Sequence, residues 1–311
     1  MKRIWIRVAL CLVALFGTVW AYLGVDWDFY DGSLVSPRCP LPSESIKNAG
    51  ERPYRFIAFG DFGEGTFFQK RLADVMSSLY QKTPFQSALL LGDNLYPNGD
   101  VAKLAGPNFE EPYRLLIAQN VRFISALGNH DIKDNHQATS MSYFGMPAPY
   151  YKATQGPVDV FVLNTISFKS DPIQRQWLEK ELAESHANWK IVMGHHPMYS
   201  SGRHGNDRKL TTQLLPLLER YHVDFYLNGH EHLYERFQKV EGLTMITSGG
   251  GGAFLYNFKK ILPQSVRHVR SHHFLFFEIL DNQVTMRTIN QYGQIIDCLH
   301  FAKNTNKLVK K

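Results

Sequence analysis

Five short polar motifs, each opening with glycine, hold the side chains of this sequence that are best suited to chemistry. They contain aspartate, asparagine, histidine and tyrosine, and each directly follows an apolar stretch. The motifs are Gly60-Asp61-Phe62-Gly63, Gly92-Asp93-Asn94-Leu95-Tyr96, Gly128-Asn129-His130-Asp131, Gly194-His195-His196-Pro197 and Gly229-His230-Glu231-His232. Because glycine tolerates backbone conformations that other residues avoid, each motif can turn sharply and direct its short side chains into a crevice.

Carboxylates and neutral imidazoles gathered in one place are costly without a compensating cation. Two metal ions about 3.5–4 Å apart, with one carboxylate bridging them, would satisfy such a set. Oxygen ligands mixed with imidazole favour iron, manganese or zinc over calcium. Two rival chemistries lack their motifs, because the chain contains neither a Gly-x-Ser-x-Gly turn nor a Gly-x-x-x-x-Gly-Lys-Ser/Thr loop. The motifs therefore predict a two-metal site.

The stretches between the motifs predict the elements that must bring them together. Strands are predicted at residues 55–59, 88–91, 123–127, 159–163, 190–193 and 224–227, and helices at residues 67–80, 113–119, 173–184 and 210–221. Strands joined by turns follow at residues 236–240, 243–247, 274–280, 284–289 and 295–299. All strands of the first half except the fourth lead into a motif, and the carboxyl ends of strands form the usual site edge of α/β sheets. This order predicts an α/β (α+β) fold of two packed β-sheets with helices outside them.

The composition is that of a folded chain without a nucleic-acid-binding surface. The 311 residues are 44% hydrophobic and 20% charged, too apolar for disorder and too polar for a polytopic membrane protein. The formal net charge is +6, but seven basic residues and no acids lie in residues 1–25 and 302–311, which leaves about −1 for residues 26–301. Since the folded body is near neutral, nucleic acid is excluded as the main partner.

The N-terminus has the pattern of a targeting segment. Lys2, Arg3 and Arg7 precede an uncharged apolar run, whose length lies between that of a signal-peptide core and a transmembrane span. We favour an uncleaved signal anchor over a cleaved signal peptide. The protein would then be exported, and either membrane-anchored facing the periplasm or the extracellular or lumenal side, or secreted after cleavage.

The predicted organisation is a signal peptide or transmembrane anchor at residues 1–25, a linker at 26–53, one domain at 54–301 and a basic tail at 302–311. In an oxidising compartment, Cys39 of the linker can pair with Cys298 near the C-terminus. The alternative is one loose thiol and one buried thiol.

The five motifs resemble those of the metallophosphoesterase superfamily, and within it those of the purple acid phosphatases. The resemblance to the small, tartrate-resistant mammalian-type members extends to residues 91–96, 144–151, 176–178 and 194–200 and to His204-Gly205. Other superfamily members have histidine where this chain has Gly63, and Tyr96 replaces that ligand as in purple acid phosphatases. The resemblance implies a four-layer αββα sandwich, with two mixed β-sheets flanked by helices, which is the metallophosphoesterase fold.

The resemblance also implies a role for each metal ligand. The predicted ligands are Asp61, Tyr96 and His232 for ferric iron, Asn129, His195 and His230 for a divalent ion (Fe²⁺, Zn²⁺ or Mn²⁺), and Asp93 as the bridge between the two. Ferric iron is hard and suits an anionic phenolate and carboxylates, whereas an amide and imidazoles suit a divalent ion. Because ferric iron also acidifies bound water strongly, we expect activity at acid pH.

The implied reaction is hydrolysis of phosphate monoesters, in which a metal-bound hydroxide attacks phosphorus and a protonated imidazole donates to the leaving alkoxide. We predict His204 as that acid, with His130 as the alternative, and Asp131 as the residue that orients a neighbouring imidazole. The predicted substrate contacts are Asn129, His130, His196 and His204. The expected partners are small phosphorylated substrates and, through the N-terminal segment, a membrane.

Two other functions stay open. One is a phosphodiesterase or nucleotide hydrolase on the same two-metal core, and the other is a membrane-tethered binding protein without catalysis. Specificity would be decided by loops such as residues 133–148 and 200–209.

Overall fold

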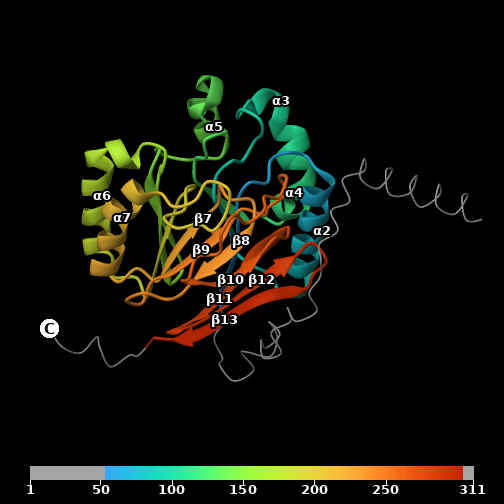
Figure 1. Cartoon of the computed structure of the whole chain (residues 1–311). Coiled ribbons are helices and arrows are strands. Elements are labelled where there is room, and N and C mark those ends of the chain that lie inside the picture. The colour runs from blue at the N-terminus through green and yellow to red at the C-terminus, as the bar shows by residue number, and fades with distance from the viewer. Residues whose placement is uncertain (1–52, 304–311) are drawn as a thin grey trace, which may run out of the picture. The chain divides into compact units, whose positions relative to one another are not determined.

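Two mixed β-sheets form the framework of the computed structural model, which describes residues 53–303 (Figure 1). The six-stranded sheet consists of β1 (Tyr54–Phe59), β2 (Ser87–Leu90), β3 (Arg122–Ser125), β11 (His273–Leu280), β12 (Gln283–Asn290) and β13 (Ile295–Ala302). The seven-stranded sheet consists of β4 (Tyr151–Gln155), β5 (Val158–Val162), β6 (Trp189–Met193), β7 (Phe225–Asn228), β8 (Tyr234–Phe237), β9 (Thr244–Ser248) and β10 (Ser265–Val269).

The strand order places the ends of the motif-bearing strands together. The first sheet has the order β13-β12-β11-β1-β2-β3, and the second has the order β10-β8-β9-β7-β6-β5-β4. β1, β2 and β3 are parallel to one another, as are β5, β6, β7 and β9. Within each sheet, the carboxyl ends of these strands therefore lie on one edge.

Helices cover the outer face of each sheet, and three of the helices begin at a side-chain cap. The helices are α2 (Phe67–Lys82), α3 (Val101–Ala105), α4 (Glu111–Ala118), α5 (Gln137–Tyr143), α6 (Pro172–Glu184) and α7 (Arg208–Arg220), with short turns η2 (Gly106–Glu110), η3 (Lys133–Asn135) and η4 (Phe168–Ser170). Thr66, Asp171 and Asp207 cap α2, α6 and α7 by accepting a hydrogen bond from a backbone N–H of the first turn.

Three apolar clusters fill the spaces between the layers. Alternate residues of β1 face opposite ways, so that Phe56 packs in the cluster between the two sheets and Ile57 packs in the cluster under α2 and α4. On the second sheet, Val192 of β6 packs with Leu178 of α6 and Leu214 of α7. The layers are therefore helix, sheet, sheet and helix, which confirms the predicted αββα sandwich.

The structure adds elements that the sequence pattern did not predict. β4, β10, α3 and α5 were not expected, and β8 begins two residues before the predicted strand at 236–240. Within residues 53–303, no helix is both long and apolar enough to cross a membrane. The predicted targeting segment at residues 1–25 and the linker up to residue 52 lie outside the described residues, as does the tail beyond residue 303. The domain boundaries therefore stay predictions.

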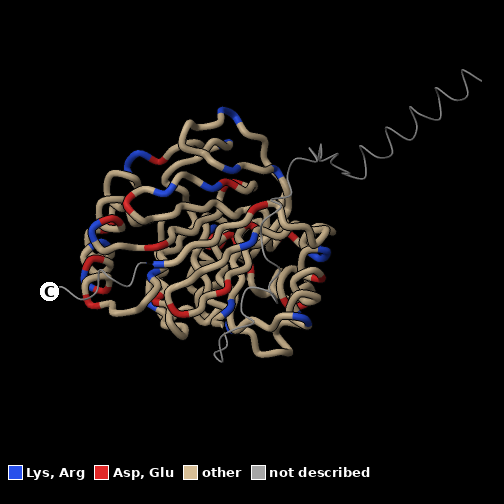
Figure 2. Tube along the Cα trace, turned by 90° about the horizontal axis from the view of Figure 1, so that it is seen from below, with Lys and Arg blue, Asp and Glu red and all other residues tan. Residues whose placement is uncertain are grey.

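Two further features bear on the chemistry of the chain. Cys298 in β13 is disulfide-bonded, and its predicted partner, Cys39, lies outside the described residues. Basic and acidic residues are interspersed along the trace in the view of Figure 2, as the near-neutral charge of the folded body suggests.

Candidate metal centre

The five motifs follow β1, β2, β3, β6 and β7 and meet between the strand ends of the two sheets. Ligand atoms of Asp61, Asp93 and His195 all lie within 4.8 Å of one another, and the three side chains are buried. Backbone contacts join the loops, since Asp61 N donates to the Gly92 carbonyl at 3.0 Å. Between the sheets, His230 N donates to Asp61 Oδ2 at 2.8 Å.

The backbone is strained at three of the predicted ligands. Asp61, Asp93 and His230 have φ values of 57°, 53° and 68°, a left-handed conformation that costs non-glycine residues about 1 kcal/mol or more. Of the motif glycines before the ligands, Gly92 has the predicted turn conformation, with φ at 90°, whereas Gly128 and Gly229 serve the site differently. A Cβ at Gly128 would lie 2.1 Å from Asp93 N, and one at Gly229 would lie 2.4 Å from Asp61 Oδ2. At these two positions glycine allows loops to touch, while the ligand residues themselves turn the chain.

Tyr96 is at the centre of one donor set. Its hydroxyl lies 3.1 Å from Asp61 Oδ1, 3.0 Å from Asp93 Oδ2 and 3.1 Å from His232 Nε2. Burial, and then the charges of Asp61 and Asp93, raise the pKa of Tyr96 far above its usual range, so the phenol keeps its proton unless a cation replaces it. A Cβ at Gly63 would lie 1.7 Å from the Asn94 carbonyl oxygen. No histidine side chain fits there, and it is the Tyr96 hydroxyl that lies beside Asp61 and His232.

His195 is at the centre of the second donor set. Its Nε2 lies 3.2 Å from Asn129 Oδ1, 3.3 Å from His230 Nδ1 and 3.3 Å from Asp93 Oδ2. Burial alone would lower the pKa of His195, but the charges of Asp93 and Asp61 raise it to about 10. Each donor set thus holds a proton, on the Tyr96 hydroxyl in one and on His195 in the other, which limits the buried negative charge. A metal cation bound at the same place would compensate that charge instead.

Hydrogen bonds to carbonyls orient the imidazoles. His195 Nδ1 donates to the Leu91 carbonyl at 3.0 Å, and His232 Nδ1 donates to the Phe254 carbonyl at 2.7 Å. Because a carbonyl oxygen can only accept, these bonds leave Nε2 of both rings available for a metal ion. The residues present therefore fit a pair of metal ions. The two donor sets are Asp61, Tyr96 and His232, and Asn129, His195 and His230, with Asp93 beside both.

His130 lies at the edge of the donor sets. Its backbone N–H donates to Asp93 Oδ1 at 2.7 Å, and its Nδ1 donates to the Pro97 carbonyl at 2.6 Å. Its ring packs against Tyr96 with centroids 4.4 Å apart. Its Nε2 lies 3.9 Å from Asp93 Oδ2, on the side where the two donor sets meet.

Asp131 contacts a different partner from the one predicted. Its fully buried carboxylate accepts hydrogen bonds from the backbone N–H groups of Asn94 and Gly128 and from the Asn94 side chain, at 2.8–2.9 Å. Burial and the charge of Asp93 raise the pKa of Asp131 to about 7. Asp131 therefore joins the loops after β2 and β3 and does not orient an imidazole.

His196 and His204 both pack against the ring of His230. The His204 ring stacks on the His230 ring with centroids 4.2 Å apart, and its side chain is 40% exposed. His196 is largely buried, and its Nδ1 lies 2.9 Å from Thr165 Oγ1. Burial and the charge of His195 lower the pKa of His196 to about 3. The neutral form of the His196 ring is therefore favoured.

Sequence reasoning missed three residues that contact these groups. Glu231 accepts hydrogen bonds from the backbone of the loop that carries His204, Thr165 holds His196, and Tyr256 stacks on His232 with centroids 4.0 Å apart. Glu231 stands inside a motif, which was a usable signal. Thr165 follows the one early strand to which no motif was assigned, and nothing in the sequence singles out Tyr256.

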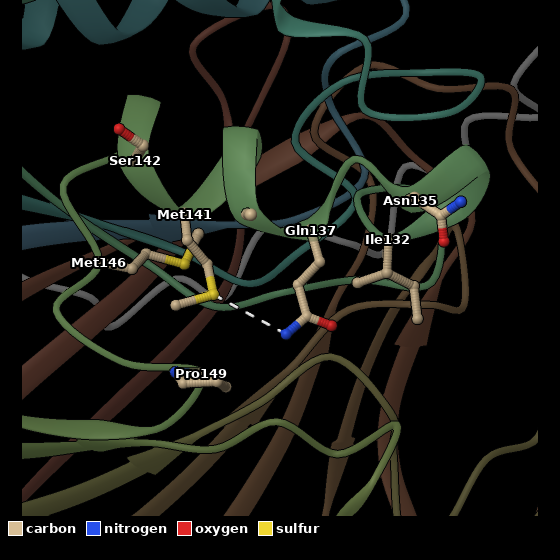
Figure 3. A pocket seen from close by; sticks show the side chains of 8 residues that line it. Ile132, Asn135, Gln137, Met141, Ser142, Met146 and Pro149 are labelled. Atoms are coloured by element: carbon tan, nitrogen blue, oxygen red, sulfur yellow. Dashed lines mark hydrogen bonds between the residues drawn. The ribbon is translucent and has the colours of Figure 1, made fainter.

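The two loops expected to decide specificity each border a hollow. One hollow of about 430 Å³ adjoins the site and is lined by His196, Pro197, His204, Gly205, Asn206, Asp207, Arg208 and His230. Another of about 600 Å³ lies at α5, where Figure 3 shows Met141, Met146 and Pro149 at its wall. None of the predicted metal ligands lines the second hollow, so the first is the one placed to receive a substrate.

A two-sheet αββα sandwich with two adjacent carboxylate, imidazole and phenol sets at its strand ends defines a dimetal phosphoesterase. The calcineurin-like phosphoesterase family model matches residues 54–234. Tartrate-resistant acid phosphatase type 5 of Mus musculus is 30% identical over 270 residues, covering 74% of this chain and 80% of that protein. Purple acid phosphatase 7 of Arabidopsis thaliana is 28% identical over 238 residues, covering 66% and 72%. The chain belongs to the calcineurin-like phosphoesterase family and, within it, to the purple acid phosphatases.

Solved structures share the fold. A purple acid phosphatase from yellow lupin (Lupinus luteus) seeds has a TM-score of 0.75 at 19% identity, covering 88% of this chain and 57% of that longer chain. GAP50, the anchor in the inner membrane complex of Plasmodium, has a TM-score of 0.70 at 20% identity, covering 82% and 90%. At these identities the similarity shows the fold alone.

Proposed function

We propose that this chain is an exported acid phosphatase with a two-metal centre that hydrolyses phosphate monoesters. The observation that carries the proposal is the place of Asp93. Its Oδ2 lies 3.0 Å from the Tyr96 hydroxyl and 3.3 Å from His195 Nε2, so one carboxylate oxygen borders both donor sets. A carboxylate shared in this way is what a two-metal site requires.

Ferric iron would be held by Asp61, Tyr96 and His232, and a divalent Fe²⁺, Zn²⁺ or Mn²⁺ by Asn129, His195 and His230. When bound, the two ions would supply positive charge for the phosphate oxygens and a water acidic enough to attack phosphorus below neutral pH. The buried carboxylates and the phenol suit the harder ion, and the amide and imidazoles suit the softer one.

His204 is placed to protonate the leaving alcohol. It is half exposed beside His230, and Glu231 Oε1 lies 3.4 Å from its Nδ1. With Nδ1 facing Glu231, Nε2 remains to donate its proton to the ester oxygen. On the other side of the centre, His130 Nδ1 donates to the Pro97 carbonyl, so Nε2 would donate to a phosphate oxygen only in the doubly protonated ring.

Export is supported by two independent features. The basic and apolar pattern of residues 1–25 is typical of a targeting segment. A disulfide such as the one at Cys298 is typical of proteins in an oxidising compartment.

The visible spectrum of iron-loaded protein tests the metal assignment. A phenolate bound to ferric iron absorbs visible light by charge transfer, so the wild-type protein should be coloured and Tyr96→Phe should lose the band. Tyr113→Phe, which alters another fully buried tyrosine, should keep it. A band that survives in Tyr96→Phe at full iron content contradicts the assignment of Tyr96.

Comparing two nitrophenyl substrates separates the proposal from its main rival. Faster hydrolysis of p-nitrophenyl phosphate supports a monoesterase, whereas faster hydrolysis of bis-p-nitrophenyl phosphate indicates a phosphodiesterase. Hydrolysis of neither by fully metallated protein would indicate a binding role without catalysis.

A further inference from the structure

Arg203 has a fixed place at the edge of the candidate metal centre. Its backbone N–H donates to Glu231 Oε2 at 2.7 Å, which anchors it to the segment between the predicted ligands His230 and His232. Its guanidinium lies over the ring of Tyr256, with Cζ 5.0 Å from the ring centroid. Both ends of this residue are therefore held.

Tyr256 connects Arg203 to the site. Its ring stacks on His232 at 4.0 Å and 10°, and it meets the His204 ring edge-on at 5.7 Å. Its backbone N–H also donates to the His232 carbonyl at 3.0 Å. The guanidinium, the phenol and the imidazole thus form one stack that extends from a predicted ferric ligand towards the solvent.

The guanidinium of Arg203 contacts the Tyr256 ring but is not neutralised by an acidic side chain in the described part of the chain. No ion pair joins it to a carboxylate among residues 53–303, whereas the nearby Asp207 is paired with Lys169 at 2.6 Å. The carboxylate of Glu231, which binds the Arg203 backbone, already accepts three backbone N–H bonds. An exposed, oriented guanidinium is well suited to binding an anionic oxygen group, because its planar donors match a carboxylate or a phosphate.

We propose that Arg203, positioned by Tyr256 and Glu231, binds a second anionic group of the substrate. The preferred substrates are then phosphate esters whose alcohol part carries a carboxylate or another phosphate. This inference rests on the proposed phosphomonoesterase function, since the first phosphate must be bound at the metal centre. Arg203 would thus favour phosphate esters whose alcohol part carries a second anionic group.

Matched substrate pairs test this with the metallated full chain. Glycerol 2-phosphate and 2-phosphoglycerate differ only by a hydroxymethyl group in place of a carboxylate, and fructose 6-phosphate and fructose 1,6-bisphosphate differ by one phosphate. We expect wild-type kcat/KM to be about tenfold higher for the anion-bearing member of at least one pair. Which pair responds decides between carboxylate and phosphate.

In Arg203→Gln this preference should disappear through a higher KM for the anion-bearing member. Arg203→Lys, which keeps the charge but not the planar donors, should restore part of it and serves if the glutamine variant folds poorly. Arg220→Gln removes an exposed arginine at the far end of α7 and should keep the preference. No preference in the wild type, or the same preference in Arg203→Gln, overturns the inference. Failure of the wild type on all four esters refutes the proposed function itself.

Discussion

Glu231→Gln should disturb the loop that carries His204 more than its near-isosteric change suggests. The fully buried carboxylate accepts backbone N–H bonds from Arg203 at 2.7 Å, His204 at 2.5 Å and Gly205 at 3.3 Å. A glutamine has only one oxygen, so whichever way it is oriented, its NH₂ group faces at least one N–H donor. Two donors then point at each other in a buried place.

The size of the effect follows from these contacts. One charge-assisted hydrogen bond is worth about 1.5–3 kcal/mol, and a buried donor without a partner costs about 1–3 kcal/mol. We therefore expect the free energy of unfolding to fall by about 3 kcal/mol. Because a displacement near 1 Å can reduce a rate about 100-fold, kcat for an alkyl phosphate should fall by a similar factor, with a smaller change in KM.

Urea unfolding and steady-state kinetics measure the two effects, and Glu235→Gln is the matched control. Glu235 is equally buried and accepts from the backbone N–H and the hydroxyl of Ser201 in the same loop. A glutamine there can donate to that hydroxyl, because a hydroxyl also accepts. The control should lose about 1 kcal/mol or less. Equal losses of kcat in both variants would refute the specific role of Glu231 in placing His204.

Two further predictions follow from single residues. His204→Ala should slow an alkyl phosphate such as glycerol 2-phosphate about 100-fold and p-nitrophenyl phosphate much less, since a good leaving group needs no acid; equal losses would assign the acid role elsewhere. Burial lowers the pKa of His273 to about 4 from 6.5, so its stabilising contribution is present above pH 6.5 and is lost as the pH falls towards 4. The free energy of unfolding should fall by up to about 3 kcal/mol over that range. In urea titrations at pH 7.5 and 5, His273→Gln should show a smaller difference in the free energy of unfolding between the two pH values. The same difference in wild type and variant would contradict the assignment of this pH dependence to His273.

The donor sets were predictable because each motif is local. A strand, a glycine and a polar residue stand next to one another in the sequence, and parallel pairing brings their ends together without further information. The two unpredicted strands, β4 and β10, are the edges of the seven-stranded sheet. Edge residues are only half covered, so β4 contains Lys152 and Thr154, and the apolar pattern that identifies inner strands is weak there.

Contacts between distant loops could not be predicted. Asp131 was expected to face an imidazole, but the loops after β2 and β3 approach so closely that backbone N–H groups reach its carboxylate first. Glu231 meets Arg203, which lies 28 residues away in the sequence. Such partners depend on how the loops cross, which neither spacing nor residue type reveals.

The left-handed backbone at Asp61, Asp93 and His230 also bears on how the protein acquires its ions. Strain of this kind persists only where the surrounding structure fixes the chain, so the sheets and loops around the site would hold these residues in place before an ion binds. Such a site differs from small zinc domains, which fold around their ion. A site whose ligand residues are in place before metal binding would accept any suitable cation that its surroundings provide. The supply of metals where the chain finishes folding would therefore decide the occupancy of the divalent position.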